Sequence, residues 1–408
     1  MPKRKLFLRR IRIINETKNL NNSKEVMLVI EKKLFVSIFA FLFCVFSFAS
    51  DPLAQVHSTE EILLSYVEDS RNNLASEKQK LTTSDSDIRI VTDEADAVLF
   101  ILQKLKAGTP VNKDDWKRLF STEGYSRLKA RESGRKRSFE DVGFREFVQS
   151  SELLAKADAL AETLTSWKQA DMKAALTRAL AYLPTGTAIR CKVYPVIKPW
   201  TNSFVYELKT NPAIFLYLNP EMNAAQLENT VAHELHHIGY AAACLPTYET
   251  EEFKNKPTKV RTVLEWVASF GEGFAMLAAA GGPDIHPHAV SPASDRERWD
   301  KDMANFNTDL RKVEDFFLDI LDGRLKEEEE IRKVASSFFG IQGPWYTVGW
   351  KMAVTVEKTF GLAKLIGCLC DPLGFLVAYN DAAVRKNDLT GESLALWSSQ
   401  LFRRLELP

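Results

Sequence analysis

The sequence of 408 residues lacks most features that identify common classes of protein. It has no net charge, with 54 Lys and Arg against 54 Asp and Glu, and so lacks the cationic excess that nucleic-acid binding requires. Five cysteines are too few for a disulfide-rich scaffold. The sequence contains no GxSxG elbow, P-loop or complete GxGxxG loop, so serine hydrolases, NTPases and dinucleotide-binding proteins have no support. What is present is the composition of a folded protein, with 45% hydrophobic residues.

The charges are unevenly distributed along the chain. Residues 1–33 contain ten Lys or Arg and three Glu, whereas residues 34–49 contain no charged residue. A basic segment followed by a short apolar run is typical of a secretory signal peptide, and the small Ser47 and Ala49 suit cleavage after Ala49. We therefore interpret residues 1–49 as a signal or targeting segment and expect an exported protein, either periplasmic or secreted.

Two alternatives for this segment remain open. The apolar run of residues 34–49 is shorter than the roughly 20 residues of a transmembrane helix, but it could still anchor the chain if it is not cleaved. The basic stretch is longer than in most signals, and Met27 begins a well-proportioned one, so translation could start there. In either case we expect membrane contact only through this segment.

Removal of the segment changes the charge and the cysteine count of what remains. The chain from residue 50 onward is mildly acidic, which strengthens the exclusion of nucleic acid. An even number of cysteines remains, and we expect buried thiols or one or two structural disulfides. These cysteines are Cys191, Cys244, Cys368 and Cys370.

The hydrophobic pattern predicts helices interrupted once by strands. From about residue 56 to 182, apolar residues recur at three- and four-residue spacing. The period changes to two at residues 189–194, and residues 203–208 and 213–218 read as two more strands. Helical spacing returns after Asn223 and continues to the end. The prediction is a predominantly α-helical α+β fold with a small antiparallel sheet before residue 220.

The motif His233-Glu234-x-x-His237 carries the clearest chemistry. Residues four apart lie one above the other on a helix, so the two imidazoles can converge on one zinc ion. Glu234 lies about 100° around the helix from His233, where it can accept a proton from the attacking water. A histidine-rich core helix is the alternative interpretation. The other side of this helix carries an apolar stripe, which consists of Leu227, Val231, Leu235 and Ile238.

A catalytic zinc ion needs a third protein ligand. The HExxHxxGxxH form is excluded, because Tyr240 and Ala243 replace its glycine and its last histidine. The apolar helix predicted over residues 262–280 contains Glu272 between two glycines, and a carboxylate in such a helix needs a cationic partner. We predict Glu272 as the third ligand, with Glu265, about two turns earlier, as the competitor.

This ligand set resembles that of the gluzincin metallopeptidases. The wider pattern resembles a family of uncharacterised bacterial zinc-dependent peptidases. Thermolysin-like relatives often have an acidic residue four positions after the ligand glutamate, whereas this chain has Met276 there. The similar segments are Trp116-Lys-Arg-Leu-Phe120, AHELHH, GEGFA and Trp345-Tyr346-x-x-Gly349.

The resemblance implies a zincin-like core, one Zn²⁺ ion and hydrolysis of a peptide bond in a peptide or protein substrate. It assigns Glu234 as general base and requires a further donor for the oxyanion, for which we predict Tyr346, with Tyr240 and His288 as alternatives. In gluzincins an edge strand before the zinc helix pairs with the substrate, and residues 213–218 are expected to do so here.

The resulting organisation has three parts. We predict the targeting segment over residues 1–49, an N-terminal helical region over residues 50–184, and the zincin-like catalytic region with C-terminal helices over residues 185–408. Two other functions remain open. One is a zinc-stabilised, non-catalytic binding or scaffold protein of the cell envelope, and the other is a zinc amidase that acts on cell-wall fragments.

Overall fold

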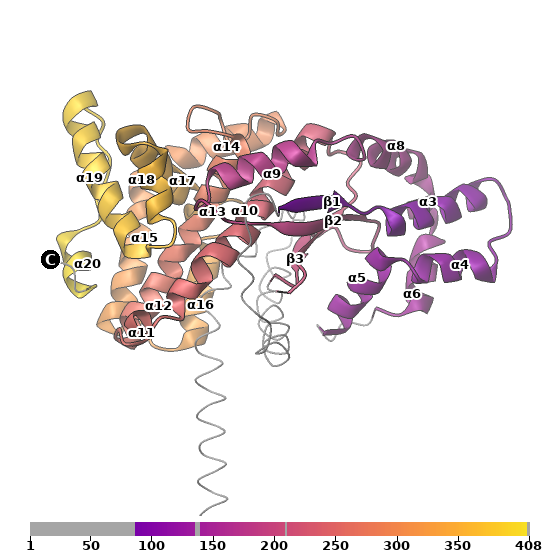
Figure 1. Cartoon of the computed structure of the whole chain (residues 1–408), viewed down its shortest axis with the longest axis horizontal. Coiled ribbons are helices and arrows are strands. Elements are labelled where there is room, and N and C mark those ends of the chain that lie inside the picture. The colour runs from indigo at the N-terminus through magenta and orange to yellow at the C-terminus, as the bar shows by residue number, and fades with distance from the viewer. Residues whose placement is uncertain (1–85, 135–138, 209, 406–408) are drawn as a thin grey trace, which may run out of the picture.

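The computed structural model describes residues 86–134, 139–208 and 210–405. The predicted targeting segment lies outside these residues and stays a prediction. The described residues form helices around one small sheet, which confirms a mainly helical α+β fold. Figure 1 shows the N-terminal helices, in indigo and magenta, at one end of the molecule and the C-terminal helices, in orange and yellow, at the other.

The N-terminal helices are short, and three of them begin with a side-chain cap. Asn112 accepts hydrogen bonds from the backbone amides of Asp114 and Asp115. The apolar faces, with Trp116 and Leu119 among their buried residues, join the common core. The helices are α3 (Asp93–Lys106), α4 (Lys113–Phe120), α5 (Glu123–Gly134), α6 (Asp141–Val148), α7 (Ser151–Ala155), α8 (Ala157–Trp167) and α9 (Met172–Ala181).

The sheet has the strand order β1-β2-β4-β3 and is mixed. Its strands are β1 (Asp87–Ile90), β2 (Arg190–Val196), β3 (Phe204–Tyr206) and β4 (Ala213–Tyr217). Strands β1 and β2 are parallel, as are β2 and β4, and only β3 and β4 are antiparallel. The prediction of an antiparallel sheet is therefore wrong for the pairing of β2 with β4 and right for the pairing of β3 with β4. Strand β1 was not predicted, because it is only four residues long and its partner lies about a hundred residues away.

The position of the edge strand also differs from the prediction. Strand β4, within the predicted range 213–218, is paired on both sides, with β2 and with β3. Strand β3 has only β4 as a strand partner among the described residues. The chain leaves β2, forms the outer strand β3 and returns between them as β4. Among the described residues, the edge strands of the sheet are therefore β1 and β3, and residues 213–218 do not form an edge.

The helices after the sheet build the larger part of the core. These helices are α10 (Ala224–Tyr248), α11 (Glu251–Lys254), α12 (Thr258–Val267), the 3₁₀ helix η3 (Ala268–Phe270), α13 (Gly271–Ala280), α14 (Ala293–Met303), α15 (Phe306–Asp322), α16 (Glu328–Ser337), α17 (Pro344–Phe360), α18 (Leu362–Cys368), α19 (Pro372–Thr390) and α20 (Ser399–Arg404). Helix α13 lies at the centre and packs against α9, α10 and α17. This packing brings α10 and α17 to the same buried helix.

A disulfide bond holds the end of α10 to the C-terminal helices. Cys244 in α10 is bonded to Cys370, which lies between α18 and α19. Cys191 and Cys368 are buried free thiols. One structural disulfide and two buried thiols agree with the prediction of buried thiols or one or two structural disulfides.

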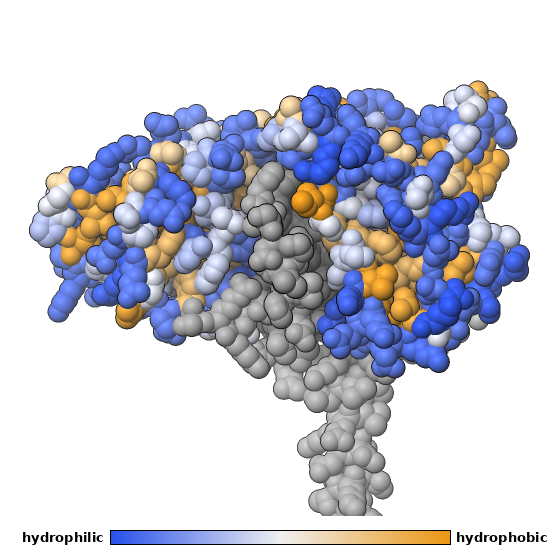
Figure 2. Space-filling model, turned by 180° about the vertical axis from the view of Figure 1, so that it is seen from behind, coloured by the Kyte–Doolittle hydropathy of each residue, from blue (hydrophilic) through white to orange (hydrophobic). Residues whose placement is uncertain are grey.

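The segment Thr258–Ala280 is long and apolar enough to cross a membrane, but all of its most apolar window is buried inside the protein. It is therefore the central core helix, broken by η3. Figure 2 shows that the face turned away from the viewer of Figure 1 is largely hydrophilic, with separate hydrophobic patches. Among the described residues, no other helix meets the length and hydropathy of a membrane span.

Candidate metal centre

Helix α10 begins at a complete capping box. The Asn223 side chain accepts from the Gln226 backbone amide, and the Gln226 side chain accepts from the Asn223 amide. The helix is 25 residues long, so the motif residues lie well inside it, where the backbone is fixed by intrahelical hydrogen bonds. The predicted apolar stripe is buried throughout; its members are Leu227, Val231, Leu235 and Ile238.

Three side chains from two helices converge on the other side of α10. His233 Nε2 and His237 Nε2 are 3.0 Å apart. Glu272 Oε2, on α13, lies 3.3 Å from His233 Nε2 and 3.2 Å from His237 Nε2. All three residues are buried, and their ligand atoms lie within 4.8 Å of one another. The structure thus brings together the three residues that the sequence predicted as metal ligands.

The geometry of this group fits a zinc ion. Ligand atoms about 2.0–2.1 Å from a tetrahedral zinc lie about 3.3 Å from one another, close to the observed spacings. Both carboxylate oxygens of Glu272 are buried and have no hydrogen-bond partner among the described residues. A buried carboxylate without a partner is costly, and a cation removes that cost.

The protonation of the histidines also suits a metal. Burial lowers the pKa of His233 to about 4 and the pKa of His237 to about 3, so both imidazoles are neutral at neutral pH. The neutral ring has a free nitrogen lone pair, which is the form that binds a metal. Burial also raises the pKa of Glu272 to about 7, as expected for an acid without its cation.

The long helix predicted over residues 262–280 contains a short 3₁₀ segment just before Glu272. The turn η3 separates α12 from α13, and Glu272 is the second residue of α13. The competitor Glu265 lies in α12, is buried, and is close enough to Tyr248 to raise its pKa. Glu265 does not belong to the convergent group.

A close contact between glycines fixes the position of α13 against α17. A Cβ atom on Gly273 would lie 2.0 Å from the Trp350 backbone nitrogen and 2.7 Å from the Cα of Gly349. A Cβ atom on Gly349 would in turn lie 2.5 Å from the Phe270 carbonyl oxygen. Only glycine allows the two backbones to approach this closely. The sequence contained these glycines, but nothing in it showed that they meet.

Glu234 is buried next to the histidines without joining the convergent group. Burial and, secondly, the nearby Glu272 carboxylate raise the pKa of Glu234 well above its usual value. The helix geometry that places His233 and His237 one above the other leaves Glu234 at the side of the group, as the sequence predicted.

Tyr346 lies against the same group, on the first turn of α17. Its ring is nearly parallel to the ring of His233, with an angle of 12° and centroids 6.3 Å apart. The phenol oxygen is buried and has no hydrogen-bond partner among the described residues. Burial raises the pKa of this phenol well above its usual value, so it keeps its proton and remains a donor.

The two alternative donors lie elsewhere. The hydroxyl of Tyr240 is 3.1 Å from the hydroxyl of Tyr248. His288 Nδ1 is 3.0 Å from the Ser291 hydroxyl, and its ring packs on Trp299. Of the three candidates, Tyr346 is the one whose ring stacks on His233.

Sequence reasoning left one feature of the ligand histidines unresolved. Met276, at the position where thermolysin-like relatives often have an acid, is buried among apolar neighbours. His233 Nδ1 has no hydrogen-bond partner among the described residues. The ring of Tyr346 therefore adds to the contacts with His237 and Glu272 that restrain the buried His233 imidazole.

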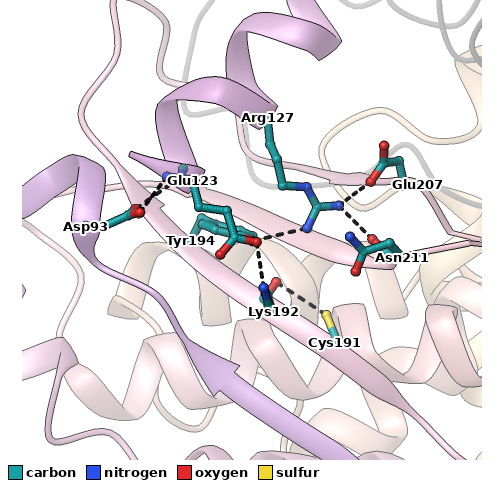
Figure 3. Close-up of polar contacts among 9 residues, drawn as sticks. Asp93, Glu123, Arg127, Cys191, Lys192, Tyr194, Glu207 and Asn211 are labelled. Atoms are coloured by element: carbon teal, nitrogen blue, oxygen red, sulfur yellow. Dashed lines mark hydrogen bonds and ion pairs between the residues drawn. The ribbon is translucent and has the colours of Figure 1, made fainter. Parts of the chain in front are cut away.

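A polar network that the sequence did not predict holds the free edge of the sheet. Arg127 on α5 donates to Glu207 Oε2 at 2.5 Å, to the Asn211 carbonyl at 2.7 Å and to the Tyr194 hydroxyl at 3.1 Å. Glu207, directly after β3, has a positive φ of 51°, which is unusual outside glycine. Figure 3 shows Arg127 reaching across the sheet to these groups. One arginine from a distant helix thus fixes the turn between β3 and β4.

The comparisons with known proteins agree with this site. A family model described as "Putative zinc dependent peptidase (DUF5700)" matches residues 116–388. The match includes all of the convergent residues, Glu234 and Tyr346. No curated protein and no solved structure matches the chain.

Proposed function

The chain belongs to this family of zinc-dependent peptidases, and on that premise we propose that it is an exported metallopeptidase of the gluzincin type with Glu234 as general base. The observation that carries the proposal is the convergence of His233, His237 and Glu272 with Glu234 directly beside them. A structural zinc site is closed by four protein ligands, whereas three ligands leave a position for reaction.

The residues of the chain divide the chemistry between them. When bound, zinc polarises the scissile carbonyl and acidifies the attacking water. Glu234 takes the proton of that water and delivers it to the leaving amine. His233 and His237 remain neutral and serve as ligands, and Glu272 supplies the negative charge that balances the cation.

Tyr346 is the proposed donor to the developing oxyanion. Its phenol is buried, protonated and unpaired in the described structure, and its ring is held beside His233. A donor that is already positioned and dry needs no reorganisation when charge develops on the substrate oxygen. The hydroxyl therefore has no partner in the protein alone and gains one, the oxyanion, during the reaction.

Strand β3 is the proposed docking strand for the substrate backbone. Its outer edge is unpaired among the described residues, and the network around Arg127 holds the turn that follows it. An extended peptide can add to such an edge through main-chain hydrogen bonds. This role was predicted for residues 213–218, but that strand is already paired on both sides.

Export is supported by two independent features. Residues 1–49 have the charge and hydrophobicity of a signal segment. The Cys244–Cys370 disulfide suits an oxidising compartment, since cytosolic thiols are normally kept reduced. We propose a periplasmic or secreted location, with membrane contact only through residues 34–49 if they are retained.

The test combines metal analysis with peptide cleavage. Wild type, Glu234→Gln and the control Glu249→Gln, which changes an exposed glutamate at the end of the same helix, are assayed for zinc content and on a mixed peptide library. We expect one zinc per chain in all three and cleavage in wild type and the control, with at least about a hundredfold loss in Glu234→Gln.

The outcomes separate the competing functions. Zinc without Glu234-dependent cleavage of any peptide would favour the scaffold protein, and cleavage of cell-wall amides alone would favour the amidase. The ligand assignment is tested in parallel by the isosteric pair Glu272→Gln and Glu265→Gln. We expect only the first to lose zinc on dialysis, and loss in the second alone would overturn the assignment.

A further inference from the structure

A cavity of about 430 Å³ lies beyond the N-terminal side of the metal centre. It is enclosed by α7 and α8, by the end of β4, by the loop from β4 to α10, and by the start of α10. A volume of this size falls within the range of ligand pockets in proteins. The metal centre described above does not include this cavity.

The cavity borders the metal centre through Thr230, which lines it. Thr230 precedes His233 by three residues and His237 by seven, so it lies within about 60° of both around the helix. Side chains three apart on a helix are about 5–6 Å apart at their Cβ atoms. The cavity therefore begins one helical turn from a zinc ligand, on the face that carries both histidines.

The cavity also borders the free edge of the sheet. Ser203, which lines it, directly precedes β3, and Leu216 and Tyr217 are the last residues of the neighbouring strand β4. A substrate backbone along β3 presents alternate side chains to one face. A side chain next to the scissile bond is thus within reach of the cavity.

The walls are mainly apolar, and several of their polar groups are already bonded. Trp167 and Leu216 are buried wall residues, and the Trp167 indole donates to the Met222 carbonyl at 2.8 Å. The Thr230 hydroxyl donates to the Gln226 carbonyl at 3.0 Å, and the Ser203 hydroxyl accepts from the Tyr217 amide at 3.0 Å. These bonds keep the cavity open and leave those groups with little to offer a polar ligand.

Charge is confined to the rim. Lys156 and Glu221 are the charged residues among those that line the cavity, and both are exposed. Lys156 donates to Glu152 at 2.7 Å on the outer surface. A charged side chain in the interior would be desolvated without a partner, at high cost.

We propose that this cavity is a specificity pocket that binds an uncharged, apolar side chain of the substrate, next to the scissile bond. The inference rests on the proposed peptidase function, because it places the pocket beside the reacting bond. Trp167, Leu216 and Met222 provide the apolar contact, and Ala155 and Ala159 on the rim leave the entrance wide.

Binding is measured on the zinc-loaded full chain carrying Glu234→Gln, so that cleavage is not required. The probes are labelled peptides of Ala and Ser that differ at one position, which is Leu, Ala or Asp. Ala159→Phe fills the pocket from an exposed position, Met222→Ala enlarges it, and Thr165→Phe adds the same ring to an exposed position of α8 outside the pocket.

We expect the Leu peptide to bind about 10- to 100-fold more tightly than the Ala or Asp peptide. Ala159→Phe should remove this preference while binding of the Ala peptide stays the same. Met222→Ala should extend the preference to a further peptide that has Trp at the varied position. Thr165→Phe should match the parent. Equal binding of all three peptides, or an unchanged preference in both pocket variants, would overturn the pocket.

The same chains separate this inference from the proposed function. Wild type is assayed for cleavage of the Leu peptide in parallel. A preference for Leu that Ala159→Phe removes, together with no cleavage by wild type, would retain the pocket as a binding site and reject the peptidase. Cleavage without any side-chain preference would retain the peptidase and reject the pocket.

Discussion

At the metal centre, two polar side chains are buried without hydrogen-bond partners, and a bound cation or substrate would supply those partners. The Glu272 carboxylate is fully buried without a hydrogen bond among the described residues, and the Tyr346 hydroxyl is in the same condition. Buried polar groups are normally paired, which agrees with the proposal that a cation binds Glu272 and that the substrate oxyanion binds Tyr346. Burial is also unfavourable for the ionised form of other acids, and there it affects the stability of the folded state.

Tyr346→Phe should lower activity without lowering stability. The lost hydroxyl has no partner in the described structure, so the free energy of unfolding should stay the same or rise slightly. If the hydroxyl binds the oxyanion, kcat should fall about 10²- to 10³-fold with little change in KM or zinc content. Peptide kinetics and thermal unfolding check this, and an unchanged kcat would remove Tyr346 from the reaction.

Glu94 on α3 should make the fold less stable as the pH rises. Burial raises its pKa to about 8 in the folded state, although Oε2 accepts from the Ile197 amide at 3.0 Å. Between its ordinary pKa and about 8, the folded state keeps a proton that the unfolded state releases, so stability falls with rising pH and levels off above that value.

Glu94→Gln should therefore stabilise the protein more at pH 8 than at pH 5, since the amide keeps an acceptor for Ile197 and cannot ionise. The difference should be on the order of a few kcal/mol. Unfolding midpoints of both chains at the two pH values measure it. Parallel pH dependence of wild type and variant would contradict the assignment.

At the scale of elements, the site depends on how three helices cross. Helix α10 supplies both histidines and the proposed base, Glu234, α13 supplies Glu272, and α17 supplies Tyr346. The contact of Gly273 with Gly349 brings α13 and α17 to backbone distance directly beside Glu272. The relative positions of the functional groups are therefore set by close backbone packing.

Gly273→Ala should destabilise the protein by about 3 kcal/mol or more, because the new Cβ meets backbone atoms that cannot move aside. The control is Gly143→Ala in α6, where a Cβ meets nothing within 4 Å. That change should alter stability by less than about 1 kcal/mol, in the favourable direction. Urea unfolding of both variants decides, and equal midpoints would refute the close contact.

At the scale of the whole molecule, the disulfide joins the metal-binding helix to the C-terminal helices. Cys244 and Cys370 are 126 residues apart, so the bond closes a loop that contains α12, α13 and α17. Long closed loops lose much of their freedom in the unfolded state, which favours the folded one. Because disulfides form and persist in oxidising compartments, this contribution to stability depends on such a compartment.

Replacing both Cys244 and Cys370 with Ala should lower the free energy of unfolding by about 2–5 kcal/mol. A reducing agent should destabilise wild type by a similar amount and leave the double variant unchanged, because Cys191 and Cys368 are already free thiols. Chemical denaturation with and without reductant measures this. A reductant effect in the double variant would show that another disulfide exists.

The sequence by itself determined the chemistry of the site. Its helical period places His233 and His237 on one face and Glu234 beside them, and the isolation of Glu272 in an apolar helix indicates a charged partner. These inferences depend only on short-range geometry and on the cost of burying charge. They identified the same three residues that converge in the structure.

Only the tertiary structure decided the rest. The parallel pairing of β2 and β4, the edge position of β3, the contact between Gly273 and Gly349, and the cavity beside Thr230 all join segments far apart in the chain. Local pattern shows that a strand or helix forms, but not which partner it packs against, since several arrangements bury the same apolar faces. The residues that act are therefore readable from the sequence, whereas the surfaces that receive a substrate are not.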